Sequence, residues 1–122
     1  MEVKTFYEQL GMGYEDVSGR LGSDALIKKF VIKFLDDASF TRLRDGLQEN
    51  DGEKAFRAAH TLKGICLNLS FDTLYKPCAE ITEALRDGRI TEGCNTLFLE
   101  VEKEYNRLTK AVRSILIGGE TK

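Results

Sequence analysis

The sequence is poor in the residues from which many functional sites are built. Among its 122 residues there are one histidine and three cysteines, and Cys66, Cys78 and Cys94 form no Cys-x-x-Cys pair. A structural zinc site needs about four clustered cysteine or histidine ligands. We therefore predict no metal site and no cofactor, and we interpret the cysteines as small buried hydrophobic residues.

Long apolar segments and an excess of positive charge are missing as well. No window approaches the ~18 apolar residues that a membrane span needs, and the first ten residues hold no apolar stretch of signal-peptide length. The net charge is -2, without a basic stripe that would attract nucleic acid. We therefore expect a cytoplasmic protein that binds neither nucleic acid nor a membrane.

Nucleotide-binding loops are also absent. The chain contains no Gly-x-x-x-x-Gly-Lys-Ser/Thr motif and no Gly-x-Gly-x-x-Gly motif, so it has no nucleotide site of those kinds. A Ser-His-Asp or Cys-His enzyme would have to use the only histidine, His60. Chemistry that needs an imidazole is thus confined to one position.

What is present suffices for one folded domain made of helices. Hydrophobic residues account for 42% of the chain and charged residues for 31%, and a chain of this length can bury a core without disulfides or metals. One proline and no sustained apolar-polar alternation favour helices over strands. We predict an all-α fold, an antiparallel four-helix bundle with N-terminal helices across one end or side, and a monomer.

Glycines and apolar spacing organise the first half of the chain. Four of the eleven glycines lie in the first 22 residues, which predicts a short helix over 3–10 followed by a loose connection. A shift of the apolar phase at 37–39 predicts a break before the next helical segment. Between these points Ser23 can cap a helix through residue 36, whose apolar face holds Leu26, Ile27, Phe30, Val31 and Phe34.

Three further helices are predicted in the second half. Asp51 can cap a helix over 53–69. The next helix spans 71–87, with Ser70 as its cap, an irregular first turn because Pro77 lies inside it, and Gly88 as its stop. A last helix covers 90–117. The predicted units are therefore 1–22, a short helix and loop, 23–117, the bundle, and 118–122, a tail.

A helical wheel separates the histidine from the core. The apolar residues of the segment 53–69 fall in one arc, whereas His60 lies nearly opposite the centre of that arc and is predicted to face solvent. The predicted buried arc consists of Ala55, Ala58, Ala59, Leu62, Ile65, Cys66 and Leu69.

The neighbours of His60 on the wheel are unusual for a solvated face. Arg57 and Lys63 lie about one turn below and above it. Phe56 and Leu67 are apolar, and each either packs under a neighbouring segment or belongs to an apolar docking patch around the histidine. Gly64 is about 1 kcal/mol worse than alanine inside a helix. Because it faces away from the buried arc, we interpret it as space cleared beside the imidazole.

Together these residues suit phosphoryl transfer. An ordinary imidazole is mostly neutral at pH 7, so an exposed histidine can act as a nucleophile. Lys63, and Arg57 in addition, can offset the negative charge of a phosphoryl group. Since the chain has no nucleotide motif, the phosphoryl group would come from another protein.

The run Ala58-Ala59-His60-Thr61-Leu62-Lys63-Gly64, followed by Asn68-Leu69, closely resembles the signature of histidine-containing phosphotransfer (HPt) domains. The resemblance extends over roughly residues 24–115. One departure is Ser70, which stands where a glycine often ends the helix, at the turn before Phe71.

The resemblance implies an intermediate of a phosphorelay. His60 would take a phosphoryl group on Nε2 from the aspartate of a receiver domain and pass it to the aspartate of another. Lys63 would neutralise charge and Gly64 would leave room. From the exposed face itself, and not from the resemblance, we expect Phe56, Arg57 and Leu67 to contribute to binding. The receiver would bring Mg²⁺, so the chain would be a carrier and not an enzyme.

Three alternatives remain open at this point. The chain could be the phosphoacceptor domain of a chemotaxis-type histidine kinase, phosphorylated by an ATP-binding domain outside this sequence. It could be a helical adaptor that binds a partner without phosphorylation. A hydrolase or metalloenzyme is the third, and the sequence lacks the residues for it.

Overall fold

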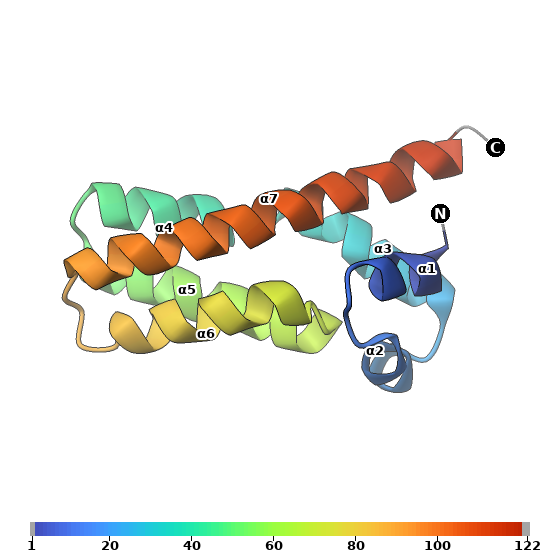
Figure 1. Ribbon diagram of the computed structural model, residues 1–122, viewed down its shortest axis with the longest axis horizontal. Helices are drawn as coiled ribbons and strands as arrows, with labels where there is room; N and C mark the ends of the chain where they lie inside the picture. The colour runs from blue at the N-terminus through green and yellow to red at the C-terminus, as the bar shows by residue number, and fades with distance from the viewer. Residues whose placement is uncertain (1, 121–122) are drawn as a thin grey trace.

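The computed structural model describes residues 2–120, with side chains for 2–116, and every regular element in it is helical (Figure 1). The predicted all-α class is thereby confirmed for the part of the chain described. The elements are α1 (Val3–Gln9), α2 (Tyr14–Leu21), α3 (Asp24–Lys33), the 3₁₀ helix η1 (Phe34–Asp36), α4 (Ser39–Gln48), α5 (Gly52–Leu69), α6 (Asp72–Ala84) and α7 (Glu92–Glu120).

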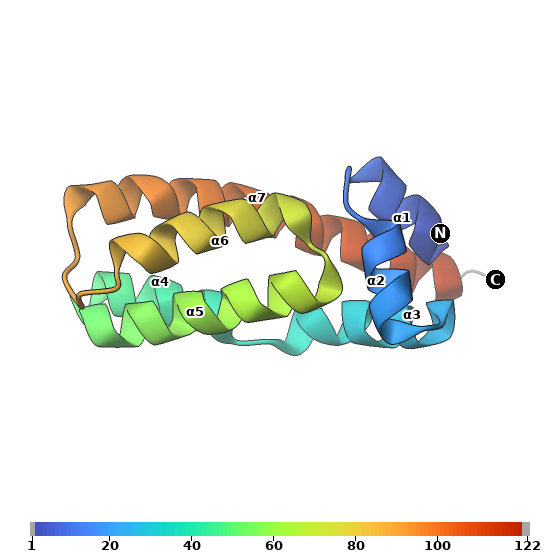
Figure 2. The ribbon, with the colours of Figure 1, turned by 90° about the horizontal axis from the view of Figure 1, so that it is seen from below.

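Helices α4 to α7 lie along one another, and each runs in the direction opposite to the one before it (Figures 1 and 2). Contacts link α4 to α5, α5 to α6, α6 to α7 and α7 back to α4. At the end of the molecule where α5 finishes, α1 and α3 contact α7, whereas α2 contacts α1, α3 and α5 (Figure 2). This arrangement leaves one side of α5 without a covering helix.

The predicted break between the third and fourth helices is present. Ser23 caps α3, accepting a hydrogen bond from the backbone N–H of Leu26 at 3.2 Å. The chain then continues as the 3₁₀ helix η1 and turns at Asp37, whose carboxylate accepts a hydrogen bond from the N–H of Ser39 at 2.9 Å. The prediction for the apolar face of α3 is wrong in part, because Leu26 and Phe30 are 37% and 36% exposed.

The loose connection predicted after residue 10 is wrong, because it contains helix α2. The glycines that suggested a loop flank this helix: Gly13 precedes it, and Gly22 ends it with a φ of 89°. The side chain of Val17, in the middle of α2, is fully buried, and this burial stabilises the helix against the rest of the protein.

Helix α5 begins and ends with defined caps. Asp51 accepts a hydrogen bond from the N–H of Lys54 at 3.1 Å, as predicted. At the other end Ser70 adopts the left-handed conformation with a φ of 53°, and Phe71 N–H donates to the carbonyl of Cys66 at 2.8 Å. This Schellman-type ending places Ser70 where glycine is favoured. The prediction that Ser70 caps the following helix is wrong, since Phe71 occupies that position without a side-chain cap.

Helices α6 and α7 differ from the predictions mainly at their ends. Helix α6 ends at Ala84 rather than residue 87, and Gly88, with a φ of 78°, lies in the turn that follows. It continues through the buried Pro77, and near its start the N–H groups of Leu74 and Tyr75 share the carbonyl of Phe71. The backbone of α7 is helical through Glu120. The rest of the predicted tail, 121–122, lies outside the described residues.

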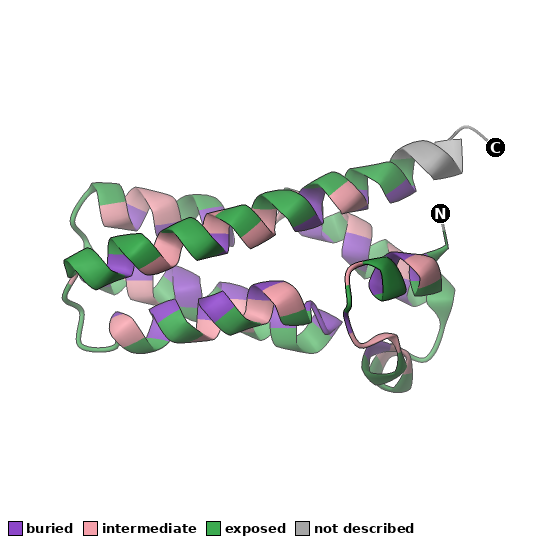
Figure 3. Cartoon of the chain, viewed as in Figure 1, coloured by how far each residue is buried: buried purple, intermediate pink, exposed green. Residues whose placement is uncertain are grey.

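The core lies along the inner sides of these helices (Figure 3). All three cysteines are buried, as predicted. Close backbone contacts draw α4 toward α5: a Cβ added at Gly46 would lie 2.7 Å from the backbone nitrogen of Ala55. A Cβ added at Gly52 would overlap the carbonyl oxygen of Gly88. Small residues therefore set how near α5 comes to its neighbours.

Candidate functional site

The two sides of α5 have opposite environments. The predicted buried arc is confirmed, with Ile65 half-buried and the other members buried. His60 lies on the opposite side of α5 and is exposed. An imidazole at this position is held by a rigid helix and is accessible to a second protein.

Gly64 lies one turn from His60 and is exposed. A Cβ built on it would meet no heavy atom within 4 Å beyond its own helix and chain neighbours. Close packing therefore does not account for this glycine, in contrast to Gly46. The absence of a side chain leaves open space beside the imidazole.

The ring of Phe56 stacks on the imidazole of His60, with 6.0 Å between centroids and 17° between planes. The guanidinium of Arg86, from the turn that follows α6, lies over the same phenyl ring at 5.6 Å. Arg86 in turn donates two hydrogen bonds to the carboxylate of Glu83, at 2.6 and 3.1 Å. Phe56 is half-buried, with His60 and Arg86 as its neighbours. It is therefore part of the site and does not form an open apolar patch.

Lys63 lies on the side of the site that faces α6. Its side chain is half-buried, and it forms no ion pair among residues 2–116. The hydrogen bonds and charge of Arg86, with a smaller contribution from the charge of Lys63, lower the pKa of Glu83. The charge of Lys63 therefore acts on Glu83 of α6, although its ammonium forms no ion pair among the described residues.

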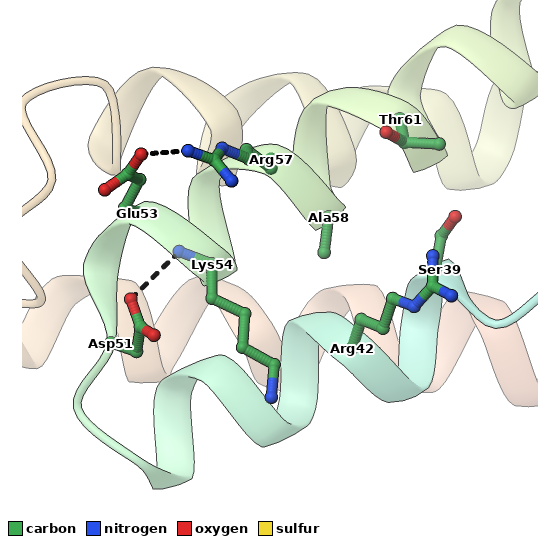
Figure 4. A pocket seen from close by; sticks show the side chains of 8 residues that line it. All are labelled: Ser39, Arg42, Asp51, Glu53, Lys54, Arg57, Ala58 and Thr61. Atoms are coloured by element: carbon green, nitrogen blue, oxygen red, sulfur yellow. Dashed lines mark hydrogen bonds and ion pairs between the residues drawn. The ribbon is translucent and has the colours of Figure 1, made fainter.

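Arg57 lies on the other side of His60, facing α4. It pairs with Glu53 one turn earlier. Both residues line a cleft of about 440 Å³ between α4 and α5, into which Arg42 also points (Figure 4). The predicted pair of flanking cations is therefore split between two sides, and only Lys63 has no carboxylate bonded to it.

A second hollow, of about 460 Å³, lies beside Gly64. Leu67, on its rim, is 58% exposed and packs under no neighbouring segment. Arg20, from α2, lies 48 positions earlier in the sequence than Asn68 and donates a hydrogen bond to its carbonyl at 2.7 Å. Neither Arg20 nor Arg86 could be found from the sequence, because contacts between distant segments have no local pattern. The hollow is lined by Arg20, Thr61, Gly64, Ile65, Leu67 and Asn68.

The described residues form no group of three or more side chains that could hold a metal ion. Across the same residues no helix is long and apolar enough to cross a bilayer. What the site offers is one accessible nitrogen nucleophile, an unpaired ammonium and open space. That combination can accept a group delivered by a partner.

Comparison with known protein families gives a match to this chain. The family model described as the Hpt domain matches residues 30–111, from the end of α3 into α7. The matched stretch contains His60, Lys63 and Gly64, and it leaves out α1 and α2. Neither the curated proteins nor the solved structures compared with the chain gave a match.

Proposed function

The chain belongs to the Hpt domain family, and from this premise we propose that it carries phosphoryl groups between receiver domains of a phosphorelay on His60. Hpt domains are histidine phosphotransfer modules. The proposal assigns α4 to α7 as the antiparallel four-helix bundle of that module, within residues 23–117. Residues 1–22 are an addition to it.

The observation that carries the assignment of the site is the open space at Gly64 beside an exposed imidazole. His60 Nε2 must come into bonding distance of the phosphorus on the receiver aspartate, so the receiver has to close over the surface around His60. A side chain at position 64 would project into the same space. Helical stability favours alanine there by about 1 kcal/mol, and the site forgoes it.

The proposed transfer needs no nucleotide, because the phosphoryl group and its acceptor both belong to the two proteins. The lone pair of His60 Nε2 attacks the phosphorus of the aspartyl phosphate, forming a P–N bond. The P–O bond to the aspartate breaks, and its electron pair leaves with the carboxylate. The imidazole keeps its proton on Nδ1. In the onward step the carboxylate of a second receiver attacks the same phosphorus, and the P–N bond breaks.

Lys63 is proposed to neutralise the phosphoryl oxygens during this exchange. Its ammonium has no ion pair within the described residues, so no salt bridge has to break first. Arg57 is bonded to Glu53 and contributes less. Phe56 supports the imidazole through the stack, and Leu67 offers an exposed apolar contact to the partner.

The proposal makes the chain a carrier without its own nucleotide site. Mg²⁺, when present, is held by the receiver domain, where it stabilises charge on the transferred group. The partners proposed are the receiver domains of response regulators and hybrid histidine kinases. The monomeric state stays a prediction.

Transfer from isolated receivers tests the proposal. Each receiver domain of the source organism is phosphorylated with acetyl phosphate and mixed with the wild type, His60→Gln or Lys110→Gln. Lys110 is exposed on α7 and serves as the matched surface control. We expect at least one receiver to transfer label to the wild type and to Lys110→Gln, and none to His60→Gln.

Two results would contradict the proposal in different ways. Label on the wild type from an ATP-loaded histidine kinase domain, with none from any receiver, would favour the chemotaxis-type phosphoacceptor. Unchanged biological output of His60→Gln, with partner binding retained, would favour the adaptor.

A further inference from the structure

Helices α1 and α2 lie outside the stretch that the family model matches, yet they are built firmly into the molecule. Phe6, Tyr7 and Val17 are almost completely buried. The hydroxyl of Tyr7 donates to the carbonyl of Leu69 at 2.6 Å, at the end of α5. The N-terminal helices are therefore a fixed part of the surface near the end of α5 (Figure 2).

Arg20 is the residue through which this segment reaches the face of His60. Its Nη1 donates to the carbonyl of Asn68 at 2.7 Å and to Oγ of Ser70 at 3.2 Å. Arg20 is exposed and forms no ion pair with a carboxylate among residues 2–116. An oriented positive charge, without a negative partner, thus lies at the surface.

The position of this charge connects it to the proposed phosphotransfer site. Arg20 lines the same hollow as Thr61 and Gly64, which are one and four residues from His60. Leu67 on the rim is 58% exposed. A protein that covers His60 and enters the space at Gly64 must therefore also approach Arg20.

We infer that α2 extends the docking face beyond the family domain, with Arg20 as a contact that recognises an acidic surface of the receiver beside its phosphorylation pocket. The inference rests on the proposed function, because it names a further residue that binds the same partner. The occupant is a receiver because the hollow that Arg20 lines adjoins His60, to which the proposed function brings a receiver, and an unpaired guanidinium complements carboxylates on that partner's surface. The N-terminal helices would then help this chain choose among receivers that share the common fold.

A structural role for Arg20 has to be separated from docking. The guanidinium also satisfies the carbonyl of Asn68 and bonds the hydroxyl of Ser70 at the end of α5, so its removal can loosen that turn. Ser70→Ala removes one of the two anchoring hydrogen bonds and keeps the charge. It is therefore the matched control for disturbance of the turn, and Lys110→Ala is the control for loss of one surface cation.

The test compares two phosphoryl donors for wild type, Arg20→Ala, Ser70→Ala and Lys110→Ala. One donor is a phosphorylated receiver shown to serve the wild type. The other is phosphoramidate, a small molecule that needs no docking face. We expect Arg20→Ala to raise the KM for the receiver about tenfold at low salt and to leave the rate with phosphoramidate within about twofold of wild type. The two controls should match wild type with both donors.

Salt provides a second readout that a structural role would not move. Raising ionic strength should raise the KM of the wild type more steeply than that of Arg20→Ala, because the variant lacks the charge being screened. Equal KM values and equal salt slopes for wild type and Arg20→Ala would overturn the inference while the proposed function stands. No transfer from any receiver to the wild type would overturn both.

Discussion

The inner and outer sides of α5 use small residues for opposite purposes. On the inner side Ala55 meets Gly46 of α4, where an added Cβ would lie 2.7 Å from the backbone nitrogen of Ala55. On the outer side a Cβ added at Gly64 would have no heavy atom within 4 Å beyond its own helix and chain neighbours. Both glycines lie inside helices and cost helical stability there.

The difference separates packing from function. Gly46 lets two helices approach, so its cost is offset by buried area. Gly64 brings no helix closer, so its value has to lie in what approaches from outside. The same comparison applies to the leucines of α5, since Leu62 is fully buried and Leu67 is 58% exposed.

The largest expected effect comes from one substitution made on both sides of α5. Leu62→Ala removes fully buried methyl groups and should lower the free energy of unfolding by about 2–5 kcal/mol. Leu67→Ala should change it by less than about 0.5 kcal/mol and slow phosphoryl transfer from a receiver about fivefold. Urea unfolding and transfer kinetics measure the two effects. Equal stability losses would show that the outer side is packed after all.

The two glycines give the next contrast. Gly46→Ala should destabilise the fold by about 1–3 kcal/mol, because the backbone of α5 must move away. Gly64→Ala should stabilise it by up to about 1 kcal/mol and slow transfer from the receiver, since the methyl group enters the cleared space. Thermal unfolding and transfer rates are the measurements. A Gly64→Ala variant with wild-type transfer would show that the receiver does not need the space beside the imidazole.

The pH dependence of stability tests the contact of Tyr7 with the end of α5. Burial, with a further contribution from the charge of Asp72, raises the pKa of the Tyr7 hydroxyl far above its ordinary range, while Arg20 opposes the shift. Because the pKa of Tyr7 is higher in the folded than in the unfolded state, ionisation of this hydroxyl favours unfolding. The stability that the protonated hydroxyl contributes is therefore complete below about pH 10 and is lost progressively above it.

Tyr7→Phe should cost about 1 kcal/mol at pH 8, through loss of the hydrogen bond to Leu69. Its stability should then fall less between pH 8 and pH 10.5 than that of the wild type. Urea unfolding at the two pH values measures both quantities. Parallel losses in the two proteins would mean that Tyr7 does not carry the alkaline sensitivity.

The smallest effect is expected at Arg57. Its pair with Glu53 joins two side chains that are each about 70% exposed, and such pairs contribute less than about 0.5 kcal/mol. Arg57→Ala should therefore leave stability almost unchanged and slow transfer less than Lys63→Ala does. A reversed order in the two transfer rates would move the charge-neutralising role from the α6 side of His60 to the α4 side.

Much of α5 could be predicted because its signals are local. The apolar period placed the buried arc and His60 on opposite sides, and Asp51 marked the start of the helix. The presence of α2 could not be predicted from its composition, since glycines at its two ends resemble a loop and Val17 is its only fully buried residue. Arg20 and Arg86 could not be predicted for another reason: they reach the site from α2 and from the turn after α6, which no spacing within α5 records.

The exposure of His60 shows only that a phosphoryl group could reach it, so the most direct test is to locate the phosphate itself. The wild type is incubated with a phosphorylated receiver, digested at alkaline pH and mapped by mass spectrometry. We predict one phosphoryl group, labile in acid and stable in base, on the peptide that contains His60. Phosphate that survives acid, or phosphate on any other residue, would contradict the assignment of His60 as the phosphoryl carrier.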